Sequence, residues 1–464
     1  MFFKRIYTPG LAIYSYVLGD EKAKQCVVID PTRYVAPYII HAQNAGLDII
    51  AILETHVHAD FVSGAKELKH QLNEQPTIYA SGWGGNKWIP SYADKIVNSK
   101  TPIKIGDLRI EPWHTPGHTL EHITWVCFDE SRSAADPWFA FTGDCLFVGG
   151  IGRPDLLGEE PILLLSEKMY HTLFTTLAPL PDFVEIFPSH GEGSFCGKTL
   201  KTRANSTLGY ERLHNPYLQK APFEEWKKQL MQEQAPFPPY FTSVKKKNIE
   251  GPSLINTLKV SKWEERKEES ILEDLFLLDV RHPEIFALSH LQNSLNAPFS
   301  SSFSHWVGWL LPESGSIGLI VEDHQASTDP INQLRIMGFD QEIVLLPYHQ
   351  VKEDLKHWET SFSMIEVGEI AKIQAQHQPL FVLDVRTIEE WDKGHIAGSH
   401  HIELTALDRS LSELPRDQSI AIVCRSGQRA SLAASFLMKK GFRSVTNVRG
   451  GVQAWTQAGL PLIR

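Results

Sequence analysis

Short apolar runs alternate with helical stretches from the first residue to about residue 210. The runs Cys26–Ile29 and Ile49–Leu53 consist entirely of apolar side chains, and each is followed by a polar residue. Apolar runs of this length between polar residues predict buried strands. Their alternation with helical stretches predicts an α/β fold for this part of the chain.

The apolar pattern changes near residue 235. The stretch Glu224–Gln234 has the spacing of an amphipathic helix, which the proline-rich stretch Ala235–Tyr240 then interrupts. The lysine-rich stretch Lys245–Asn248, followed by Gly251–Pro252, predicts an exposed linker. We therefore expect a first domain over residues 1–250.

An internal repeat follows this boundary. Leu277–Arg281 (LLDVR) recurs as Val382–Arg386 (VLDVR), and each copy continues with an apolar strand, a helix and a Gly-Phe pair. Two copies of one small α/β unit are the simplest interpretation. Strands that alternate with helices predict a mostly parallel sheet in each copy. The predicted domains are 251–362 and 363–464.

The composition is that of a folded protein. Of 464 residues, 42% are hydrophobic and 22% are charged, and the net charge of −10 argues against nucleic acid as a main partner. The start of the chain has no signal-peptide pattern and no apolar run could span a bilayer, so we expect a cytoplasmic protein without membrane contact. The cysteines are too widely spaced for a disulfide framework: Cys26, Cys127, Cys145, Cys196 and Cys424.

Histidines and carboxylates follow predicted strands at several places. The strand Ile49–Leu53 leads into an HxHxD cluster made by His56, His58 and Asp60. In α/β folds, ligand sites lie at the carboxyl ends of strands, and alternate residues of an extended turn can face the same site. The cluster therefore predicts a metal site, to which later positions add candidates: His118, Asp144 and His190.

This order of residues resembles the metallo-β-lactamase superfamily over residues 1 to about 210. The dinuclear hydrolases of that superfamily carry HxHxDH, then His, Asp and His, whereas this chain has Phe61 in place of the last histidine of the first motif. A phenyl ring cannot coordinate a metal. A second metal site built on Asp60 and His190 therefore lacks a ligand, which argues against a complete two-zinc centre.

The set that remains is His56, His118 and Asp144. Two histidines and one carboxylate are typical of non-haem Fe(II) oxygenases. A set that keeps His58 would instead place three histidines around a zinc ion. The residues alone leave both sets open.

Three local runs resemble more closely the bacterial persulfide dioxygenases that are fused to rhodanese domains. They are Thr55–Gly64, Gly149–Asp155 and Ser189–Lys198, and Phe61 is usual in that family. The resemblance extends over nearly the whole chain. It implies an α/β protein with an N-terminal metallo-β-lactamase αββα sandwich, an inactive rhodanese-like domain and an active one.

The resemblance also implies roles at the metal site. It implies one Fe(II) per chain on His56, His118 and Asp144, with zinc as an alternative in the isolated protein. His58 and Asp60 would assist catalysis by orienting ligands or substrate.

Further residues would bind the substrate. His190 would orient it, and the Arg153 guanidinium would bind an anionic group of a thiol cofactor, with a surface ion pair as the alternative. Cys196 either faces the substrate channel or packs as a small residue. Cys127 and Cys145 are predicted to be core residues.

A second chemistry is predicted near the carboxyl terminus. The strand Ile420–Val423 leads into the loop Cys424–Arg429, and a helical stretch begins at Ala430. A thiol on which backbone N–H groups and a helix N-terminus converge favours the thiolate, a nucleophile. Arg425 and Arg429 would add positive charge for an anionic sulfur donor.

This loop is similar to that of protein phosphatases, but its surroundings resemble a rhodanese. The segments Asp384–Arg386 and Arg449–Trp455 carry this second resemblance. In rhodaneses the cysteine carries a sulfane sulfur. The first repeat has Glu322 at the equivalent position, and Asp323–Gln325 after it form no anion cradle, so we expect this copy to be inactive.

Together these features predict an enzyme of sulfide detoxification. A low-molecular-weight thiol persulfide would react with O₂ to give sulfite and thiol, and Cys424 would exchange sulfane sulfur with sulfite, thiosulfate or a persulfide. The resemblance also implies a homo-oligomer. The alternatives are a zinc-dependent thioester hydrolase of the glyoxalase II type and a non-enzymatic sulfur-binding protein. The identity of the thiol and the direction of sulfur transfer stay open.

Overall fold

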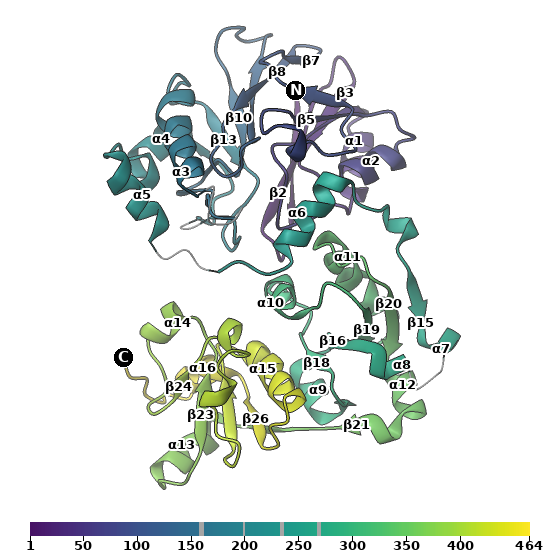
Figure 1. The fold of residues 1–464 in the computed structure, drawn as a ribbon, viewed down its shortest axis with the longest axis vertical. Coiled ribbons are helices and arrows are strands. Elements are labelled where there is room, and N and C mark those ends of the chain that lie inside the picture. Colours follow the sequence, from purple (N-terminus) through teal and green to yellow (C-terminus); the bar gives the residue numbers. More distant parts are fainter. Residues whose placement is uncertain (157–161, 198–199, 233–235, 267–270) are drawn as a thin grey trace. The chain divides into compact units, whose positions relative to one another are not determined.

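The structure is a computed structural model (Figure 1), and its chain divides into two compact units. The first unit is Met1–Thr257 together with Asn332–Asp340, and the second is Leu258–Ile331 together with Gln341–Arg464. Lys198, Glu233, Gln234 and Ala235, which belong to segments considered above, lie outside the described residues. The structure describes residues 1–156, 162–197, 200–232, 236–266 and 271–464.

The first unit is built on two six-stranded sheets. The first sheet has the order β1 (Phe2–Thr8), β2 (Ile13–Asp20), β3 (Gln25–Ile29), β4 (Asp48–Leu53), β5 (Thr77–Ser81) and β6 (Lys95–Val97). The second has the order β14 (Ser206–Thr207), β13 (Glu185–Pro188), β10 (Phe139–Gly143), β9 (Ile123–Asp129), β8 (Leu108–His114) and β7 (Ile103–Ile105). The short strands β11 (Leu146–Phe147) and β12 (Gly150–Ile151) pair beside them.

The first unit has four layers, with helices on the outer face of each sheet, and three apolar clusters lie between the layers. The two sheets pack face to face through residues such as Leu53 and Trp125. Tyr38 and Leu68 join α1 (Ala36–Asn44) and α2 (Ala65–Gln71) to the outer face of the first sheet. Met169 is among the residues that join the outer face of the second sheet to α3 (Ile162–His171), α4 (Leu208–His214) and α5 (Phe223–Met231). This confirms the predicted αββα sandwich.

The lysine-rich stretch near residue 247 was expected to be an exposed linker, and this prediction is wrong. It belongs to helix α6 (Phe241–Glu250), which has buried side chains at Phe241, Val244 and Asn248. This spacing places them on one face of a helix, while the lysines occupy the other faces. The buried face of α6 lies against the loop that follows β4, as described below.

The second unit contains two copies of one five-stranded parallel sheet. The first has the order β15 (Val260–Lys262), β20 (Ile343–Pro347), β19 (Ser316–Val321), β16 (Leu275–Asp279) and β18 (Leu295–Asn296). The second has the order β22 (Ser363–Ile365), β26 (Val445–Val448), β25 (Ile420–Val423), β23 (Phe381–Asp384) and β24 (His400–His401). Equivalent strands occupy equivalent places, which confirms the repeat and its parallel sheets.

Helices follow the strands in both repeats. The first repeat has α7 (Trp263–Arg266), α8 (Ile271–Asp274), α9 (Pro283–Leu288), α10 (Phe303–Leu310), α11 (Thr328–Ile336) and α12 (Tyr348–Asp354). The second has α13 (Val367–Ala375), α14 (Ile388–Asp392), α15 (Gln428–Lys439) and α16 (Gly451–Gln457).

The repeated Asp-Val-Arg segment has a structural role in each copy. The Arg281 guanidinium donates to both carboxylate oxygens of Asp279 at 2.7–3.0 Å, and Arg386 binds Asp384 in the same way at 2.7–3.0 Å. Both carboxylates are fully buried. Each buried charge is therefore neutralised within its own strand end, which explains why the segment recurs.

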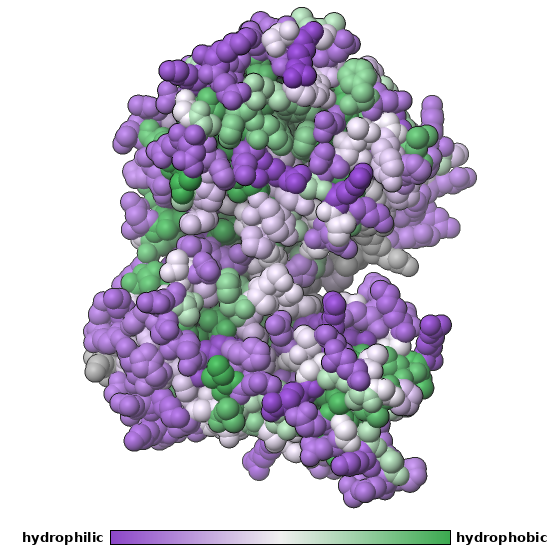
Figure 2. Space-filling view, turned by 180° about the vertical axis from the view of Figure 1, so that it is seen from behind, coloured by the Kyte–Doolittle hydropathy of each residue, from purple (hydrophilic) through white to green (hydrophobic). Residues whose placement is uncertain are grey.

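Polar and charged side chains cover most of the face shown in Figure 2, between small apolar patches. Within the described residues, no helix combines the length and the apolar character that crossing a membrane requires.

Candidate metal centre and sulfur-transfer loop

Four strand ends of the first unit bring the predicted metal ligands together. His56 lies after β4, His118 after β8, Asp144 directly after β10 and His190 after β13. One ligand atom from each of His56, His118 and Asp144 lies within 4.8 Å of the others, and all three side chains are buried. This is the edge of the sheets where a ligand site was expected.

Hydrogen bonds orient the His56 ring. The Thr55 hydroxyl donates its only proton to the Asp30 carboxylate at 2.8 Å, so it accepts from Nδ1 of His56 at 2.9 Å. The lone pair of His56 is then on Nε2, 3.8 Å from Oδ2 of Asp144.

The His118 ring is oriented by a backbone carbonyl. Its Nδ1 lies 2.9 Å from the carbonyl oxygen of Arg153, which can only accept, so Nδ1 carries the proton. Nε2 of His118 lies 3.5 Å from Oδ2 of Asp144. A histidine held in this way is typical of metal ligands.

Burial sets the protonation of these groups. It lowers the pKa of His56 well below its usual range and the pKa of His118 to about 3, so both imidazoles are neutral at neutral pH. It also raises the pKa of the Asp144 carboxyl to about 6. Within the described part of the chain, neither carboxylate oxygen of Asp144 has a hydrogen-bond partner. Two free lone pairs beside an unsatisfied buried carboxyl fit a divalent cation.

His58, Asp60 and His190 form a second set, again within 4.8 Å of one another. His190 Nε2 lies 3.3 Å from Asp60 and 3.5 Å from Asp144. Burial alone would lower the pKa of His58, but the Asp30 carboxylate, 3.3 Å away, outweighs it and raises that pKa to about 9. Nε2 of His58 therefore faces the Asp30 carboxylate as well as the second set.

In the second unit, the Cys424 thiol lies in a cradle of backbone N–H groups. Its sulfur accepts from the N–H of Gly427 at 3.1 Å and from that of Ala430, in the first turn of α15, at 3.4 Å. The carbonyl oxygen of Cys424 accepts from Val452 N–H at 2.8 Å, which fixes the loop to α16. The geometry suits a sulfur anion at the start of a long helix.

The two predicted arginines of this loop differ in their surroundings. Arg425 is exposed. Arg429 donates two hydrogen bonds to Glu390, at 2.5 and 2.7 Å, and its guanidinium carbon lies 5.5 Å from the centre of the Trp306 ring. Trp306 belongs to α10 of the first repeat, which therefore contributes to the surroundings of the loop.

Comparisons with known proteins assign both parts of the chain to known families. The chain is 31% identical to a metallo-β-lactamase from Staphylococcus aureus of known structure, with a TM-score of 0.66, over 74% of this chain and 98% of that one. The chain belongs to the metallo-β-lactamase family.

Two curated relatives match a little under half of this metallo-β-lactamase family member. Persulfide dioxygenase ETHE1 of Bos taurus, a mitochondrial protein, is 29% identical over 46% of this chain and 75% of its own length. The cytoplasmic isozyme of hydroxyacylglutathione hydrolase from Saccharomyces cerevisiae is 30% identical over 46% of this chain and 85% of its own length. Residues 366–458 match the model of the rhodanese-like domain. The chain is thus a fusion of a persulfide dioxygenase-like metallo-β-lactamase domain with a rhodanese domain.

The glycine-rich turn Gly149–Asp155 packs against Asp144 and His118 at the metal site of this family member. A Cβ atom on Gly152 would lie 1.9 Å from the carbonyl oxygen of Asp144, so only glycine fits there. The Arg153 guanidinium is buried and forms a two-point ion pair with Asp155, at 2.6 and 2.7 Å. The role of the Arg153 guanidinium in substrate binding stays a prediction. The backbone carbonyl of Arg153 orients the His118 ring.

The cysteines of the first unit are buried. Cys196 belongs to a ligand-like cluster with Asp144 and His190, and burial raises the pKa of its thiol well above the usual range. Cys127 and Cys145 lie in the apolar clusters of the sandwich. Cys196 therefore lies at the metal site, but as a buried thiol.

The sequence pattern did not single out two buried residues beside the metal site. Asp30 accepts from Thr55, from Ser189 and from the backbone of residue 55, and it faces His58. His122 accepts from the Asp144 N–H at 3.1 Å. Asp30 directly follows a buried strand, and His122 lies four residues after His118. These positions indicate a place near the metal site, but only weakly.

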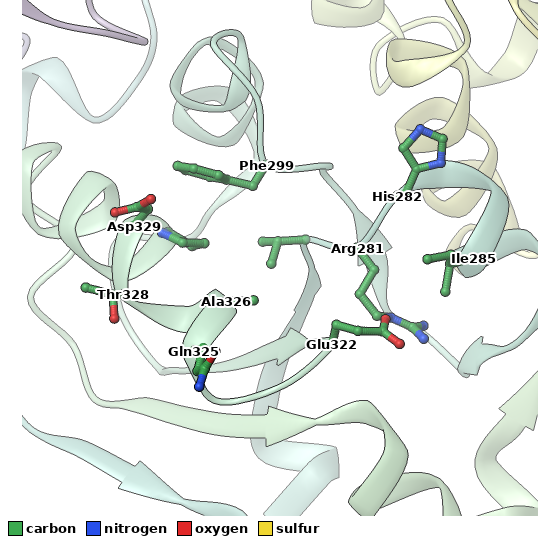
Figure 3. Close-up of a pocket in the computed structure, with 11 residues that line it drawn as sticks. Arg281, His282, Ile285, Phe299, Glu322, Gln325, Ala326, Thr328 and Asp329 are labelled. Carbon is green, nitrogen blue, oxygen red and sulfur yellow. The ribbon is translucent and has the colours of Figure 1, made fainter.

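The first repeat retains a pocket where its own cysteine loop would be. Its volume is about 390 Å³, and Figure 3 shows Glu322 beside Arg281 on one wall with Asp329 on the opposite wall. Glu322 directly follows β19, as Cys424 follows β25. A carboxylate at this place repels an anionic sulfur donor.

We expect Glu322→Ala to leave sulfur transfer unchanged, within about 2-fold, because an exposed carboxylate without a thiol has no part in that chemistry. Steady-state transfer of sulfur from thiosulfate to a thiol acceptor measures this. A loss comparable to that of a Cys424 variant would mean that the first repeat takes part in the reaction.

Proposed function

We propose that the first unit is an iron-dependent dioxygenase that converts a low-molecular-weight thiol persulfide, O₂ and water into the thiol, sulfite and two protons. The observation that carries this proposal is the buried set of His56, His118 and Asp144 in a chain similar to persulfide dioxygenases. Two imidazoles and one carboxylate are the donor set of non-haem Fe(II) oxygenases. Ferrous iron, when bound, would supply the electron transfer through which O₂ reacts with a sulfur compound.

The protein residues would hold and orient the reactants. Thr55 and the carbonyl of Arg153 keep the Nε2 lone pairs of His56 and His118 directed at the site. His58, Asp60 and His190 would lie beside the substrate, where His58 can hold a proton near a developing negative charge. The surrounding apolar layers exclude bulk water.

A single metal per chain is favoured by two features. Phe61 stands where the hydrolases have a histidine ligand, and its ring lies 4.2 Å from that of His58. His58 is paired with Asp30, which lowers its availability as a ligand. Both features weaken the second set of donors.

A zinc-dependent thioester hydrolase is the second candidate. The 30% identity to hydroxyacylglutathione hydrolase and the closeness of His58, Asp60 and His190 favour it. Such an enzyme would use a metal-activated water as its nucleophile. The attached rhodanese domain favours the persulfide chemistry instead.

The second unit would transfer sulfane sulfur. The Cys424 thiolate would attack the outer sulfur of thiosulfate, release sulfite and carry the sulfur as a persulfide to a thiol acceptor, or run this exchange in reverse. The N–H groups of Gly427 and Ala430 would stabilise the anion at each stage. Tethering the two activities raises the effective concentration of each product at the other site. The cytoplasmic location and the homo-oligomer stay predictions.

Metal analysis tests the proposed centre. We expect one iron per chain after loading with Fe(II), since Phe61 and the pairing of His58 with Asp30 weaken the second set of donors, and elemental analysis of the desalted protein measures it. Two zinc ions per chain, together with hydrolysis of a glutathione thioester, would instead favour the second candidate.

A further inference from the structure

The loop that carries His58 and Asp60 is held by residues outside the ligand motifs. The Asn248 side-chain amide donates to the carbonyl oxygens of His58 and Phe61, at 2.8 and 2.9 Å, and its oxygen accepts from Ser63 N–H at 2.9 Å. Asn248 is 1% exposed. One buried amide therefore satisfies three backbone groups of the loop.

Tyr240, at the start of α6, adds a fourth bond. Its hydroxyl donates to the carbonyl oxygen of Asp60 at 2.9 Å, and the side chain is 2% exposed. Without these donors, the carbonyls of the loop would be buried and unpaired, which proteins avoid. Helix α6 is thus bonded to the loop at both of its ends.

A segment of the first repeat completes this support. Asn332–Asp340 belongs to the first unit by its contacts, although its neighbours in sequence belong to the second. The carbonyl oxygen of Ile336 accepts from Val62 N–H at 2.8 Å. Gly338, with φ +84°, lies so close that a Cβ atom there would be 3.0 Å from the Val62 side chain and 2.9 Å from that of Val244.

The segment is bonded to the first unit by a buried arginine and by Lys247 of α6, whose Nζ donates to the Gly338 carbonyl and to the Asp340 carboxylate. Arg33 donates to the carbonyl oxygen of Arg335 at 3.1 Å and to the Asp340 carboxylate at 2.5 Å. It is 1% exposed. A buried guanidinium that binds one segment at two places holds that segment firmly.

We propose that Asn248 is a positioning residue of the metal centre, and that Asn332–Asp340 is a structural part of that centre. The Asn332–Ile336 part of α11 would then complete the support of the His58–Ser63 loop. The inference rests on the proposed metal centre but not on the reaction that occurs there.

Asn248→Asp tests the first part. The aspartate has nearly the same shape and still accepts from Ser63, but it replaces a donor by an oxygen that faces two carbonyls. His58 lies two residues after the ligand His56, so we expect Co(II) and Fe(II) to bind more weakly, by roughly 10-fold, the lower end of the effect of losing a group that orients a ligand. We also expect faster hydrogen exchange at Val62 and Ser63 in the metal-free protein. The control Asn205→Asp loses only a bond to Glu185 and should match wild type.

Arg33→Met tests the second part without altering the loop. It removes the bonds to Arg335 and Asp340, and one to the Ser253 carbonyl, but leaves those of Lys247. The segment is loosened, so we expect an exchange increase at Val62 and weaker metal binding. The control Arg212→Met also removes an arginine that binds backbone carbonyls, at Leu177, Ala178 and Leu180. Thermal unfolding of all variants is measured alongside.

Unchanged metal affinity in both Asn248→Asp and Arg33→Met would overturn the inference. The inference would also be overturned if Arg212→Met lost as much metal affinity as Arg33→Met while the two variants lost the same thermal stability. Failure of the wild-type protein to bind metal would instead refute the proposed metal centre itself.

Discussion

Replacing His56 by alanine will abolish O₂ uptake with a thiol persulfide, with a loss of at least about 100-fold. The ring supplies one of three buried donor atoms that converge on one point, and alanine offers no substitute. Losing a group that only orients a ligand costs 10- to 100-fold, so losing the ligand itself costs at least as much. An oxygen electrode and elemental analysis of the same sample measure both activity and bound iron.

The matched control is His70→Ala in the same unit. The His70 side chain is exposed and pairs with Glu74 at 3.3 Å, so this variant should keep its iron and its activity. Sulfur transfer at Cys424 should persist in both variants. Retention of wild-type O₂ uptake by His56→Ala would contradict the ligand assignment.

Replacing Cys424 by serine will stop sulfur transfer, by at least about 1,000-fold, and leave O₂ uptake intact. Serine keeps the shape of the loop and the two N–H contacts but is a far weaker nucleophile at neutral pH. Thiocyanate or thiol persulfide formation from thiosulfate measures the transfer. Cys26→Ala, which removes a buried thiol of the first unit, is the control and should retain both activities.

A Cys424→Ser protein that still transferred sulfur would place that activity at another thiol. A protein that lost O₂ uptake together with sulfur transfer would show that the two sites share a step. Either result would contradict the proposal that Cys424 carries the sulfur transfer and that the metal centre works independently of it.

Several features of the fold could be predicted from the sequence because they depend on residues that are close together in the chain. Apolar runs that end in polar residues predicted two neighbouring strands of the first sheet, β3 and β4. The repeated Asp-Val-Arg segment predicted the two copies, since each pair of charges is neutralised at its own strand end. The order of His56, His118 and Asp144 was informative for the same reason: each follows a strand at one edge of the sandwich.

Long-range contacts were not readable. Asn248 stands in a run of lysines that resembles a linker, and its role depends on carbonyls of residues far earlier in the sequence. The segment Asn332–Asp340 leaves its own repeat to join the first unit, and no local pattern encodes that. Asp30 was visible only as the end of a strand, although it is central to the charges around His58.

Simultaneous measurement of O₂ uptake and sulfite formation by the Fe(II)-loaded full chain tests the proposed persulfide dioxygenase activity most directly. Glutathione persulfide and coenzyme A persulfide are suitable probes of the thiol. We expect O₂ to be consumed and sulfite to be formed in equal amounts with at least one of them, and chelation of iron to stop both. No O₂ uptake by protein that holds its iron, with hydrolysis of a thioester by its zinc form, would contradict this expectation.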